Sequence, residues 1–525
     1  MPGHLALILH AHLPFVRHPE HERFLEESWL YEAITECYLP LLEVFEGWRR
    51  DRVPARLALT LSPTLGAMLT DPLLKLRYAQ RLDALLELAE NEIHRTHWDR
   101  TFHGLAWQCH HRFSRLRELW RANDGDLVAA FRRLQDDGVL EIITTAATHA
   151  LLPLIAGQPG ALRGQIATAR DDYRRLFGRD PRGLWLPECA YAEGLDRELA
   201  AADLRWFLMD THGLLHATPR PRYGVFAPVF TPGGVAAFGR DLESARQVWS
   251  RHEGYPGDGR YRDFYRDLGF DLDLDYVRPC LPSPDRRGFT GIKYHRIATG
   301  PDGAKLVYDR AEALRAAGEH AAHFLHARCE QFRRLAGVMD RPPILVCPYD
   351  AELFGHWWYE GPEFLDLFVR KAAYDQGDFK LVTPMDHLAE QPTLQLASPS
   401  PSSWGEEGYY RVWLNETNEW ILPHLDIAAQ RMRALAARPP APGDLPRRAL
   451  NQAARELLLA QSSDWPFILR TGTSPEYARR RVRDHLLRFI ALHEQLTATK
   501  VDEPWLAQVE AADNLFPEVD YRHWA

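Results

Sequence analysis

Short apolar segments recur along the first part of the chain, and each is followed by polar residues and then by residues at helical spacing. Short continuous apolar runs are typical of parallel strands that are buried on both faces. The segments are Leu5–Leu9, Ala55–Leu61, Leu140–Ile143, Gly183–Leu186, Leu204–Met209, Val235–Phe238, Ile344–Val346 and Lys380–Val382. Their alternation with helical stretches predicts an α/β fold, a barrel of β/α units.

Two parts of the chain depart from this alternation. Residues 75–137 are rich in Arg, Leu and Glu at helical spacing and predict a helical insertion, and the Gly- and Pro-containing residues of about 211–275 predict loops. The Pro/Ser-rich segment 391–403 has no periodicity, which indicates a linker. We therefore expect a catalytic barrel over residues 1–390 and an all-helical C-terminal domain over residues 404–525. Three helices are predicted in that domain: Glu419–Arg438, Leu445–Gln461 and Ser474–Gln495.

Composition and charge narrow the class of protein. The 525 residues include 63 Lys and Arg against 72 Asp and Glu, a net charge of −9, so neither a nucleic acid nor an anionic membrane is expected as a partner. We read no signal peptide at the start and no apolar run near the roughly 20 residues of a membrane span. The six cysteines contain no C-x-x-C pair, which favours reduced thiols and a cytoplasmic protein. Sixteen tryptophans are a high share and suggest an aromatic binding cleft.

Polar side chains follow the carboxyl ends of the predicted strands, where β/α barrels place their reactive groups. His10 and His12 end the first strand, and Glu188 and Asp350 directly follow two later ones. Two carboxyl groups facing each other across a barrel mouth are what glycoside cleavage requires. A separation of about 5–5.5 Å would indicate retention of configuration and about 6.5–9.5 Å inversion. Each carboxyl group alone is equally compatible with a helix cap or an ion pair. Glu352 is an alternative to Asp350, but alternation along the chain directs it elsewhere.

The histidines and tryptophans are ambiguous by themselves. His10 and His12 share one face of a strand, so they are candidates either for metal ligands or for hydrogen bonds to sugar hydroxyl groups. His212 and His216 form a second pair at ligand spacing. Four tryptophans stand beside polar residues and suit stacking on pyranose rings, although ordinary packing explains each of them equally well: Trp249, Trp404, Trp413 and Trp465.

Seven ordered motifs give the chain a family resemblance. They are LHAHLPF, ITTAATHALLPL, GLWLPECAY, QVWSRHEGYPGDGRYRDFYRD, YDAELFGHWWYEG, SWGEEGYYRVWLNE and SSDWPF. Through them the sequence resembles the 1,4-α-glucan branching enzymes of glycoside hydrolase family 57 over nearly its whole length. The resemblance implies a (β/α)7 barrel with a helical insertion and a C-terminal helical domain. It also implies a retaining mechanism without metal or cofactor, an α-1,4-glucan substrate, and a monomer or homodimer.

The resemblance also assigns residue roles. Glu188 matches the family's nucleophile and Asp350 its general acid/base. Four further residues match substrate-binding positions: Arg240, Gly257, Trp404 and Asp464. Five others are expected to line the same cleft: His10, His12, His149, Trp249 and Trp413.

One departure from the family pattern bears on the reaction. Family branching enzymes carry a long loop between the nucleophile strand and the arginine-bearing strand, with a tyrosine at its tip that keeps water out. Here the interval from Glu188 to Arg240 is shorter than expected, and Tyr223 is either a displaced substitute for that tyrosine or no substitute at all. An α-1,4-glucan hydrolase is therefore the alternative to a branching enzyme. Less favoured alternatives are a metal-dependent polysaccharide deacetylase and a non-catalytic glucan-binding protein.

Overall fold

Seven parallel strands form a closed ring at the centre of the molecule. The chain is described here by a computed structural model that covers residues 2–250, 253–283, 285–438 and 443–525. The seven strands are β1 (Gly3–Ala11), β2 (Leu57–Leu61), β3 (Leu140–Ile143), β4 (Gly183–Trp185), β5 (Trp206–Met209), β7 (Ala236–Gly239) and β10 (Ile344–Asp350). β1 pairs with β10 on one side and β2 on the other, and β2–β3, β4–β5 and β5–β7 also pair in parallel. A parallel bridge between Thr144 and Leu184 joins β3 to β4, and the Asp241 N–H donates to the Val346 carbonyl between β7 and β10. The predicted (β/α)7 barrel is confirmed.

Alternate residues of each strand fill the barrel. Ala6, Ile8 and Ala58 pack with Trp185 and Trp206 in an inner cluster of fully buried side chains. The intervening residues of β1 belong to the larger cluster that packs on the surrounding helices. Because both faces of every strand are buried, the strands read as continuous apolar runs.

The eighth apolar segment and the Pro/Ser segment lie outside the ring. β11 (Phe379–Leu381) pairs in parallel with the start of β1. β6 (Val229–Phe230) pairs antiparallel with β7, and β12 (Gln395–Leu396) extends that edge. Segment 391–403 also bridges from Ser402 to Tyr191. It is therefore attached to the flank of the barrel by backbone hydrogen bonds.

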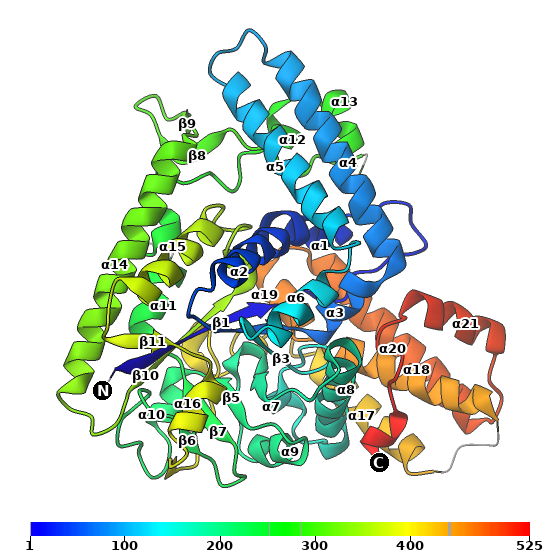
Figure 1. Cartoon of the computed structure of the whole chain (residues 1–525). Helices are drawn as coiled ribbons and strands as arrows, with labels where there is room; N and C mark the ends of the chain where they lie inside the picture. Colours follow the sequence, from blue (N-terminus) through cyan, green and yellow to red (C-terminus); the bar gives the residue numbers. More distant parts are fainter. Residues whose placement is uncertain (1, 251–252, 284, 439–442) are drawn as a thin grey trace.

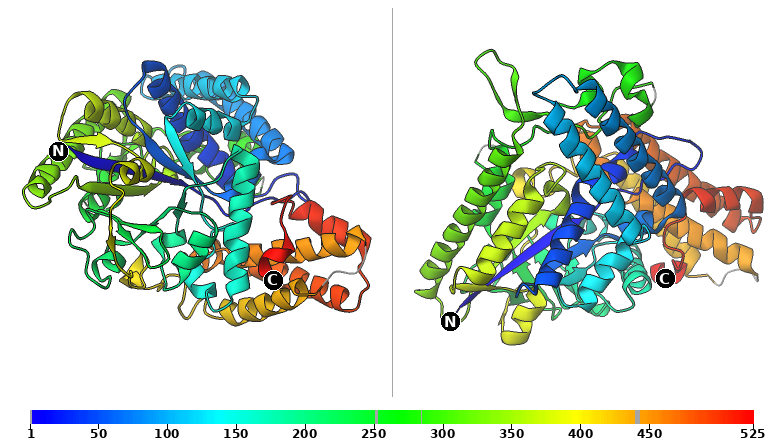
Figure 2. Two further views of the ribbon diagram at one scale, coloured as in Figure 1. Left: turned by 60° about the horizontal axis from the view of Figure 1, so that its bottom comes forward. Right: turned by 45° about the horizontal axis from the view of Figure 1, so that its top comes forward.

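Helices surround the barrel in the order expected for β/α units (Figures 1 and 2). Those associated with the barrel are α1 (Glu27–Ala33), α2 (Leu39–Asp51), α3 (Pro63–Thr70), α7 (Leu152–Ile155), α8 (Pro159–Phe177), α9 (Leu195–Ala201), α10 (Thr211–Leu215), α11 (Leu242–Trp249), α14 (Arg310–Ala336), α15 (Gly361–Tyr374) and α16 (Pro384–Glu390). A π-helical turn, η1 (Ile34–Tyr38), separates α1 from α2. The region preceding α14 carries α12 (Leu268–Asp271), α13 (Leu274–Val277) and the hairpin of β8 (His295–Thr299) and β9 (Lys305–Val307).

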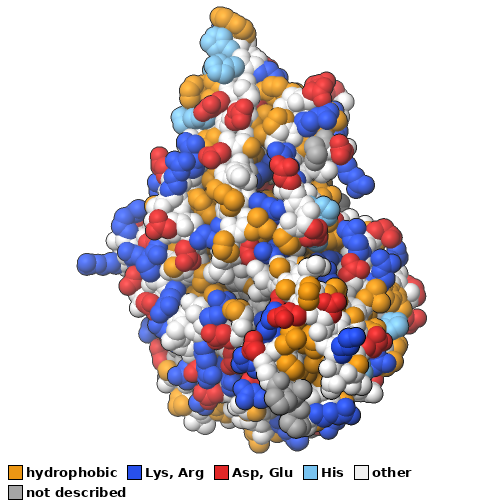
Figure 3. Space-filling model, turned by 90° about the vertical axis from the view of Figure 1, so that its right-hand side faces the viewer, with side chains coloured by type: hydrophobic (Ala, Val, Ile, Leu, Met, Phe, Trp, Pro, Cys, Tyr) orange, Lys and Arg blue, Asp and Glu red, His pale blue; other side chains and the backbone are white. Residues whose placement is uncertain are grey.

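The helical insertion forms an arm. α4 (Pro72–Arg95) and α5 (His103–Ala122) run side by side away from the barrel, and α6 (Leu127–Asp136) returns the chain to β3 (Figure 1). Asp71 caps α4 by accepting a hydrogen bond from the Leu74 N–H. Histidine side chains gather at the tip of the arm (Figure 3), where Trp98 is 91% exposed.

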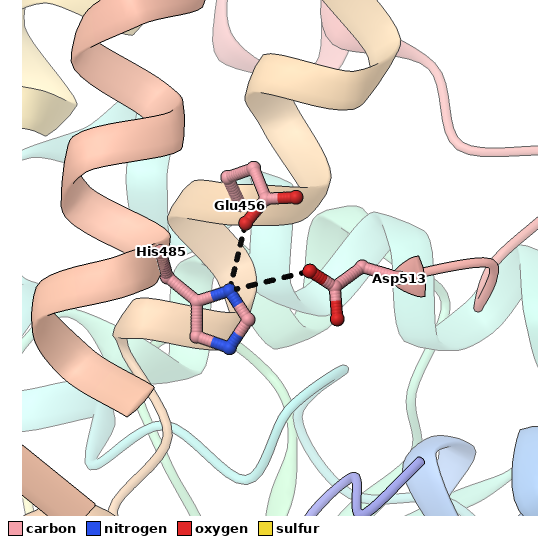
Figure 4. A group of neighbouring side chains, drawn as sticks. All are labelled: Glu456, His485 and Asp513. Atoms are coloured by element: carbon pink, nitrogen blue, oxygen red, sulfur yellow. Dashed lines mark hydrogen bonds and ion pairs between the residues drawn. The ribbon is translucent and has the colours of Figure 1, made fainter. Parts of the chain in front are cut away.

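The C-terminal part is helical. It consists of α17 (Ile421–Ala436), α18 (Asp444–Ala460), α19 (Asp464–Thr471), α20 (Pro475–Thr497), α21 (Glu503–Ala512) and a final turn, η7 (Tyr521–Trp524). A buried polar cluster joins three of these segments (Figure 4): His485 Nδ1 lies 2.7 Å from Glu456 Oε2 and 3.6 Å from Asp513 Oδ2. Arg488 and Arg481 form ion pairs with Asp513, so the negative charge in this cluster is balanced by guanidinium groups. The cluster is an internal ion-pair network that holds α18, α20 and the segment after α21 together.

The final turn is packed on a barrel helix. The Trp524 side chain is fully buried, and a Cβ placed on Gly164 of α8 would overlap its indole ring. The same applies to Gly160 and the Trp524 carbonyl. Two glycines one turn apart therefore let the end of the chain lie directly against α8.

This close approach gives a stability prediction. Gly164→Ala is expected to lower the midpoint of thermal unfolding, because overpacking of this kind costs about 1–3 kcal/mol. Gly104→Ala in α5 is the matched control, since no atom lies within 4 Å of a Cβ at that position. Alanine there is expected to leave the midpoint unchanged or to raise it. Equal midpoints for the two variants would contradict the packing described here.

Candidate active site

A cleft of about 460 Å³ opens at the carboxyl ends of the barrel strands. Its lining residues are His10, His12, His149, Glu188, Arg240, Trp249, Asp350, Glu352, Trp404, Gly405, Val412, Trp413, Asp464 and Phe467. All the residues that the family resemblance assigns to the site lie in this set except Gly257. Gly257 is exposed in the turn Tyr255–Gly257 and is not part of the cleft wall.

Glu188 follows β4 in a sharp turn. Its φ of 59° and that of Cys189, 50°, lie in the left-handed region, which is strained for residues with a side chain. The turn directs the carboxylate into the cleft, where Trp404 Nε1 donates to Oε2 at 2.6 Å. Ser463 Oγ donates to Oε1 at 3.4 Å, and His149 Nδ1 lies 3.6 Å from the same oxygen. The strain is thus opposed by donors that hold the carboxylate in one position.

Burial perturbs both carboxyl groups. It raises the pKa of Glu188 to about 8, and the negative charges of Asp350 and Asp464 act in the same direction, while the Trp404 hydrogen bond opposes them. Burial likewise raises the pKa of Asp350 to about 7, against the positive influence of His12 and Arg240. Two buried carboxyl groups that repel each other titrate as a pair, so near neutral pH the pair retains a proton. The hydrogen-bond donors around Glu188 favour its ionised form.

Glu352 also lies in the cleft, contrary to the expectation from alternation. After β10 the chain enters a short 3-10 turn, Ala351–Leu353, so alternation no longer applies. Glu352 Oε1 accepts from the Tyr38 hydroxyl at 2.5 Å and from the His12 N–H at 3.1 Å. Burial, with the nearby Asp350 carboxylate, raises its pKa to about 8.

Three histidines form a stack on one side of the cleft. The rings of His12 and His149 are 4.0 Å apart, and His10 Nε2 lies 2.9 Å from His149 Nε2. His149 Nδ1 bonds Ser463 Oγ at 2.9 Å, and His12 Nε2 lies 3.2 Å from both oxygens of Asp464. Burial holds the pKa of His10 and His149 well below the usual range, so both are neutral. These side chains form a hydrogen-bonded wall of the cleft. Because the ring nitrogens of neighbouring histidines face each other, the tautomer of one ring determines that of the next.

Aromatic side chains form another part of the cleft wall. The rings of Trp249 and Trp404 are 6.0 Å apart in an edge arrangement, and Arg240 lies over Trp404 at 5.8 Å. Trp413 closes the wall and is almost fully buried. Trp465, the fourth tryptophan considered in the sequence, is instead a core residue, fully buried with its N–H donating to the Leu459 carbonyl.

Several residues of the site lie in the C-terminal part or in loops and have no periodic signal in the sequence. Ser463 and Phe467 come from α19 and its N-terminus, and Gly405 and Val412 from the loop after β12. His212 is outside the cleft lining, held by Asp210 Oδ1 at 3.0 Å and by the Gly408 carbonyl at 2.9 Å.

Tyr223 does not occupy the cleft. Its hydroxyl donates to Asp340, which precedes β10 and therefore lies at the end of the barrel opposite the carboxyl groups. Among the described residues that line the cleft there is no tyrosine.

A parallel β/α barrel whose mouth holds buried carboxyl groups between histidine and tryptophan walls defines an enzyme that acts on glycosidic bonds. The model of the glycosyl hydrolase family 57 matches residues 6–398, and that of the 1,4-α-glucan branching enzyme C-terminal region matches residues 424–524. The chain belongs to glycosyl hydrolase family 57.

Relatives extend over the whole chain. The 1,4-α-glucan branching enzyme of Thermococcus kodakarensis is 33% identical, with 99% of this chain and 78% of that protein covered. The crystal structure of the α-amylase AmyC from Thermotoga maritima is 42% identical with a TM-score of 0.93, covering 100% and 99% of the two chains. The family 57 branching enzyme from Pyrococcus horikoshii is 32% identical with a TM-score of 0.89, covering 100% and 97%.

The Trp404–Glu188 hydrogen bond yields a testable shift in pH dependence. Trp404→Phe keeps the ring but removes the donor that stabilises ionised Glu188, so the pKa of Glu188 is expected to rise by about one unit. The acidic limb of the pH–activity profile on amylose should move to higher pH by the same amount.

Trp413→Phe is the matched control for this measurement. Trp413 lines the same cleft, but its Nε1 has no hydrogen-bond partner in the described part of the chain. The acidic limb of the pH–activity profile of Trp413→Phe is expected to stay at the wild-type pH. Equal displacement of both profiles, or of neither, would contradict the assigned hydrogen bond.

Proposed function

We propose that this chain is a 1,4-α-glucan branching enzyme that cleaves α-1,4 links and transfers the released chain to a glucose 6-hydroxyl group. One observation carries the proposal. The region that matches the branching-enzyme C-terminal model supplies Asp464 to the same cleft that holds Glu188 and Asp350. The C-terminal region and the barrel thus build one site.

In the first half of the proposed reaction, Glu188 is the nucleophile and Asp350 the general acid. A Glu188 oxygen attacks C1 of an α-1,4-linked glucose while the bond from C1 to the leaving O4 breaks, and protonated Asp350 gives its proton to O4. The product is a covalent glycosyl ester on Glu188 with inverted configuration at C1. The donors to Glu188, Trp404 and Ser463, favour the carboxylate that this step needs.

In the second half, Asp350 acts as the base. It takes the proton of an incoming 6-hydroxyl group while that oxygen bonds to C1 and the ester to Glu188 breaks. The second inversion restores the α configuration, so the enzyme retains configuration overall. The raised pKa of Asp350 suits a group that must be protonated in one step and ionised in the next.

The remaining side chains of the cleft are proposed to bind the glucan. His10, His12, His149 and Arg240 offer hydrogen bonds to sugar hydroxyl groups, with Asp464 holding His12 in place. Trp249, Trp404 and Trp413 offer flat faces for pyranose rings. Gly257, which matches a substrate-binding position of the family, is not among the residues that line this cleft.

Hydrolysis is the second candidate, and two observations favour it. The likeness to the α-amylase AmyC spans the whole chain, and the described cleft lining contains no tyrosine to exclude water. The chemistry on Glu188 would be the same, with water in place of the 6-hydroxyl group as acceptor.

We further propose the domain division and setting expected from the sequence. The barrel over residues 1–390 carries the catalytic pair, and residues 404–525 form a helical domain that completes the cleft. The described helices include none long and apolar enough to cross a membrane. The six cysteines are all free, which supports a reducing, cytoplasmic setting, and we propose a monomer or homodimer without a nucleic-acid partner.

Product analysis distinguishes transfer from hydrolysis. Amylose incubated with the protein is expected to gain α-1,6 proton signals by NMR, with few new reducing ends assayed in parallel. Glu193→Gln, an exposed carboxylate close to Glu188 in the chain, should behave as the wild type, whereas Glu188→Gln should form neither product. Reducing ends that rise without α-1,6 signals would make the protein a hydrolase. No change in either would contradict α-glucan chemistry.

A further inference from the structure

Outside the cleft, aromatic side chains form a continuous exposed surface over the loops before β8 and after β10. This outer aromatic surface consists of Phe264, Tyr265, Phe270, Phe289 and Trp357. The rings of Phe264 and Trp357 stack at 4.3 Å, Phe289 lies 5.5 Å from Phe264, and Phe270 lies 5.4 Å from Phe289. Tyr265 is 72% exposed, Trp357 53% and Phe270 48%. Clustered large aromatic side chains at this exposure are characteristic of binding surfaces.

The surface is held rigidly from below. The buried Lys293 ammonium lies 4.4 Å from the centre of the Phe264 ring and 4.6 Å from that of Phe289, and it donates to the Phe264 carbonyl. Asp267 accepts from the Thr290 N–H and hydroxyl, which fixes the loop that carries Phe289. A preformed aromatic surface binds a ligand without the entropic cost of ordering its side chains.

The same structural elements support the catalytic cleft and this surface. In the π-helical turn η1, Tyr38 holds Glu352 at the cleft, and Glu36 holds His356 beside Phe264 and Trp357. The Trp357 N–H donates to the Glu352 carbonyl at 3.2 Å. Trp357 of the outer aromatic surface is therefore hydrogen-bonded through its backbone to Glu352, which lines the cleft.

The chemistry of the surface selects a neutral ligand. Four of its charged neighbours are engaged within the protein: Arg266 pairs with Asp271, His356 with Glu36 and Lys305 with Asp263, and Arg287 donates to the Gly269 and Leu272 carbonyls. What remains exposed is flat aromatic area and the Tyr265 hydroxyl. Flat aromatic side chains stack on the apolar faces of sugar rings, and the hydroxyl groups at the edges of those rings stay in water.

We propose that the outer aromatic surface binds a segment of α-1,4-glucan chain that extends from the catalytic cleft. This inference rests on the proposed function, because it takes the polymer of that function as its ligand. A site of this kind adds affinity for long chains by holding a second segment of the same molecule. Substrates too short to span both places gain nothing from it.

Two variants of the full chain test the proposal. Trp357→Ala and Tyr265→Ala are each expected to raise KM for long amylose about threefold to tenfold, as loss of an aromatic contact predicts. Neither should change kcat, and the rise in KM should be smaller for maltoheptaose, which can place fewer sugar units on the surface than amylose can. Native electrophoresis in gels that contain amylose should show weaker retardation of both variants, a measurement of binding that needs no turnover.

Trp98→Ala is the matched control, since Trp98 is 91% exposed at the tip of the helical arm. It should keep wild-type retardation and KM. Because Tyr265 contributes little packing, its variant reports on binding even if Trp357→Ala unfolds. Unchanged retardation and KM in Tyr265→Ala, or equal loss on maltoheptaose and amylose, would overturn the proposal. A third outcome would also overturn it: the two surface variants bind amylose normally but differ from the wild type in sedimentation coefficient. The surface would then be a contact between two copies of the chain. Absence of wild-type activity on both substrates would reject the proposed function instead, and the electrophoresis would still decide on this site.

Discussion

The structure of the site depends on one electrostatic constraint: two carboxyl groups, Glu188 and Asp350, are buried in the same cleft. Each is costly to ionise there, and each raises the cost for the other. The polar contacts around the two groups differ. Trp404 and Ser463 donate to Glu188, whereas Asp350 is influenced through the charges of His12 and Arg240. Because burial raises the pKa of Glu188 (about 8) at least as far as that of Asp350 (about 7), the pair keeps a proton near neutral pH, and the donors to Glu188 oppose the burial that would place that proton on it.

This constraint explains why the barrel and the helical domain are so firmly joined. Of the donors to Glu188, Trp404 and Ser463 both come from beyond the last barrel helix. Asp464, which fixes His12, begins α19. A small displacement of the helical domain would leave Glu188 buried without its donors, at a cost of several kcal/mol for an unpaired charge. Trp524 packed against α8 and the hydrogen bond from Gln165 of α8 to Gln461 are contacts that oppose such a displacement.

Much of this organisation could be predicted from the sequence because barrels impose strict periodicity. Continuous apolar runs predicted all seven barrel strands, and the rule that reactive groups follow the carboxyl ends of strands predicted Glu188, Asp350 and the histidines. The Asp464 position comes only from the family resemblance, and Trp404 comes from its polar neighbours and from that resemblance. Neither follows a predicted strand, so periodicity alone gave no reason to place them at the barrel mouth.

The errors also have physical causes. Alternation along the chain predicts that Glu352 points away from the cleft, but alternation ends with β10, where the chain turns into a 3-10 helix. The polar neighbours of Trp465 make it a candidate either for stacking on sugar rings or for ordinary packing, and the structure shows packing, since its helix directs it into the core. The attachment of segment 391–403 to the barrel depends on backbone hydrogen bonds, which leave no trace in side-chain composition. Contacts between distant segments, such as Ser463 with Glu188, can only be found once the fold has brought them together.

The most direct test of the central claim, that Glu188 is the nucleophile of a retaining reaction, is to trap the covalent intermediate. A 5-fluoro-α-maltosyl fluoride forms a glycosyl ester readily and releases it slowly, so the labelled protein can be digested and the modified peptide identified by mass spectrometry. The label is expected on Glu188, in the peptide that contains GLWLPECAY. A label on Asp350, Glu352 or Asp464 would contradict the assignment of roles, and turnover that inverts the configuration at C1 would contradict the double displacement itself.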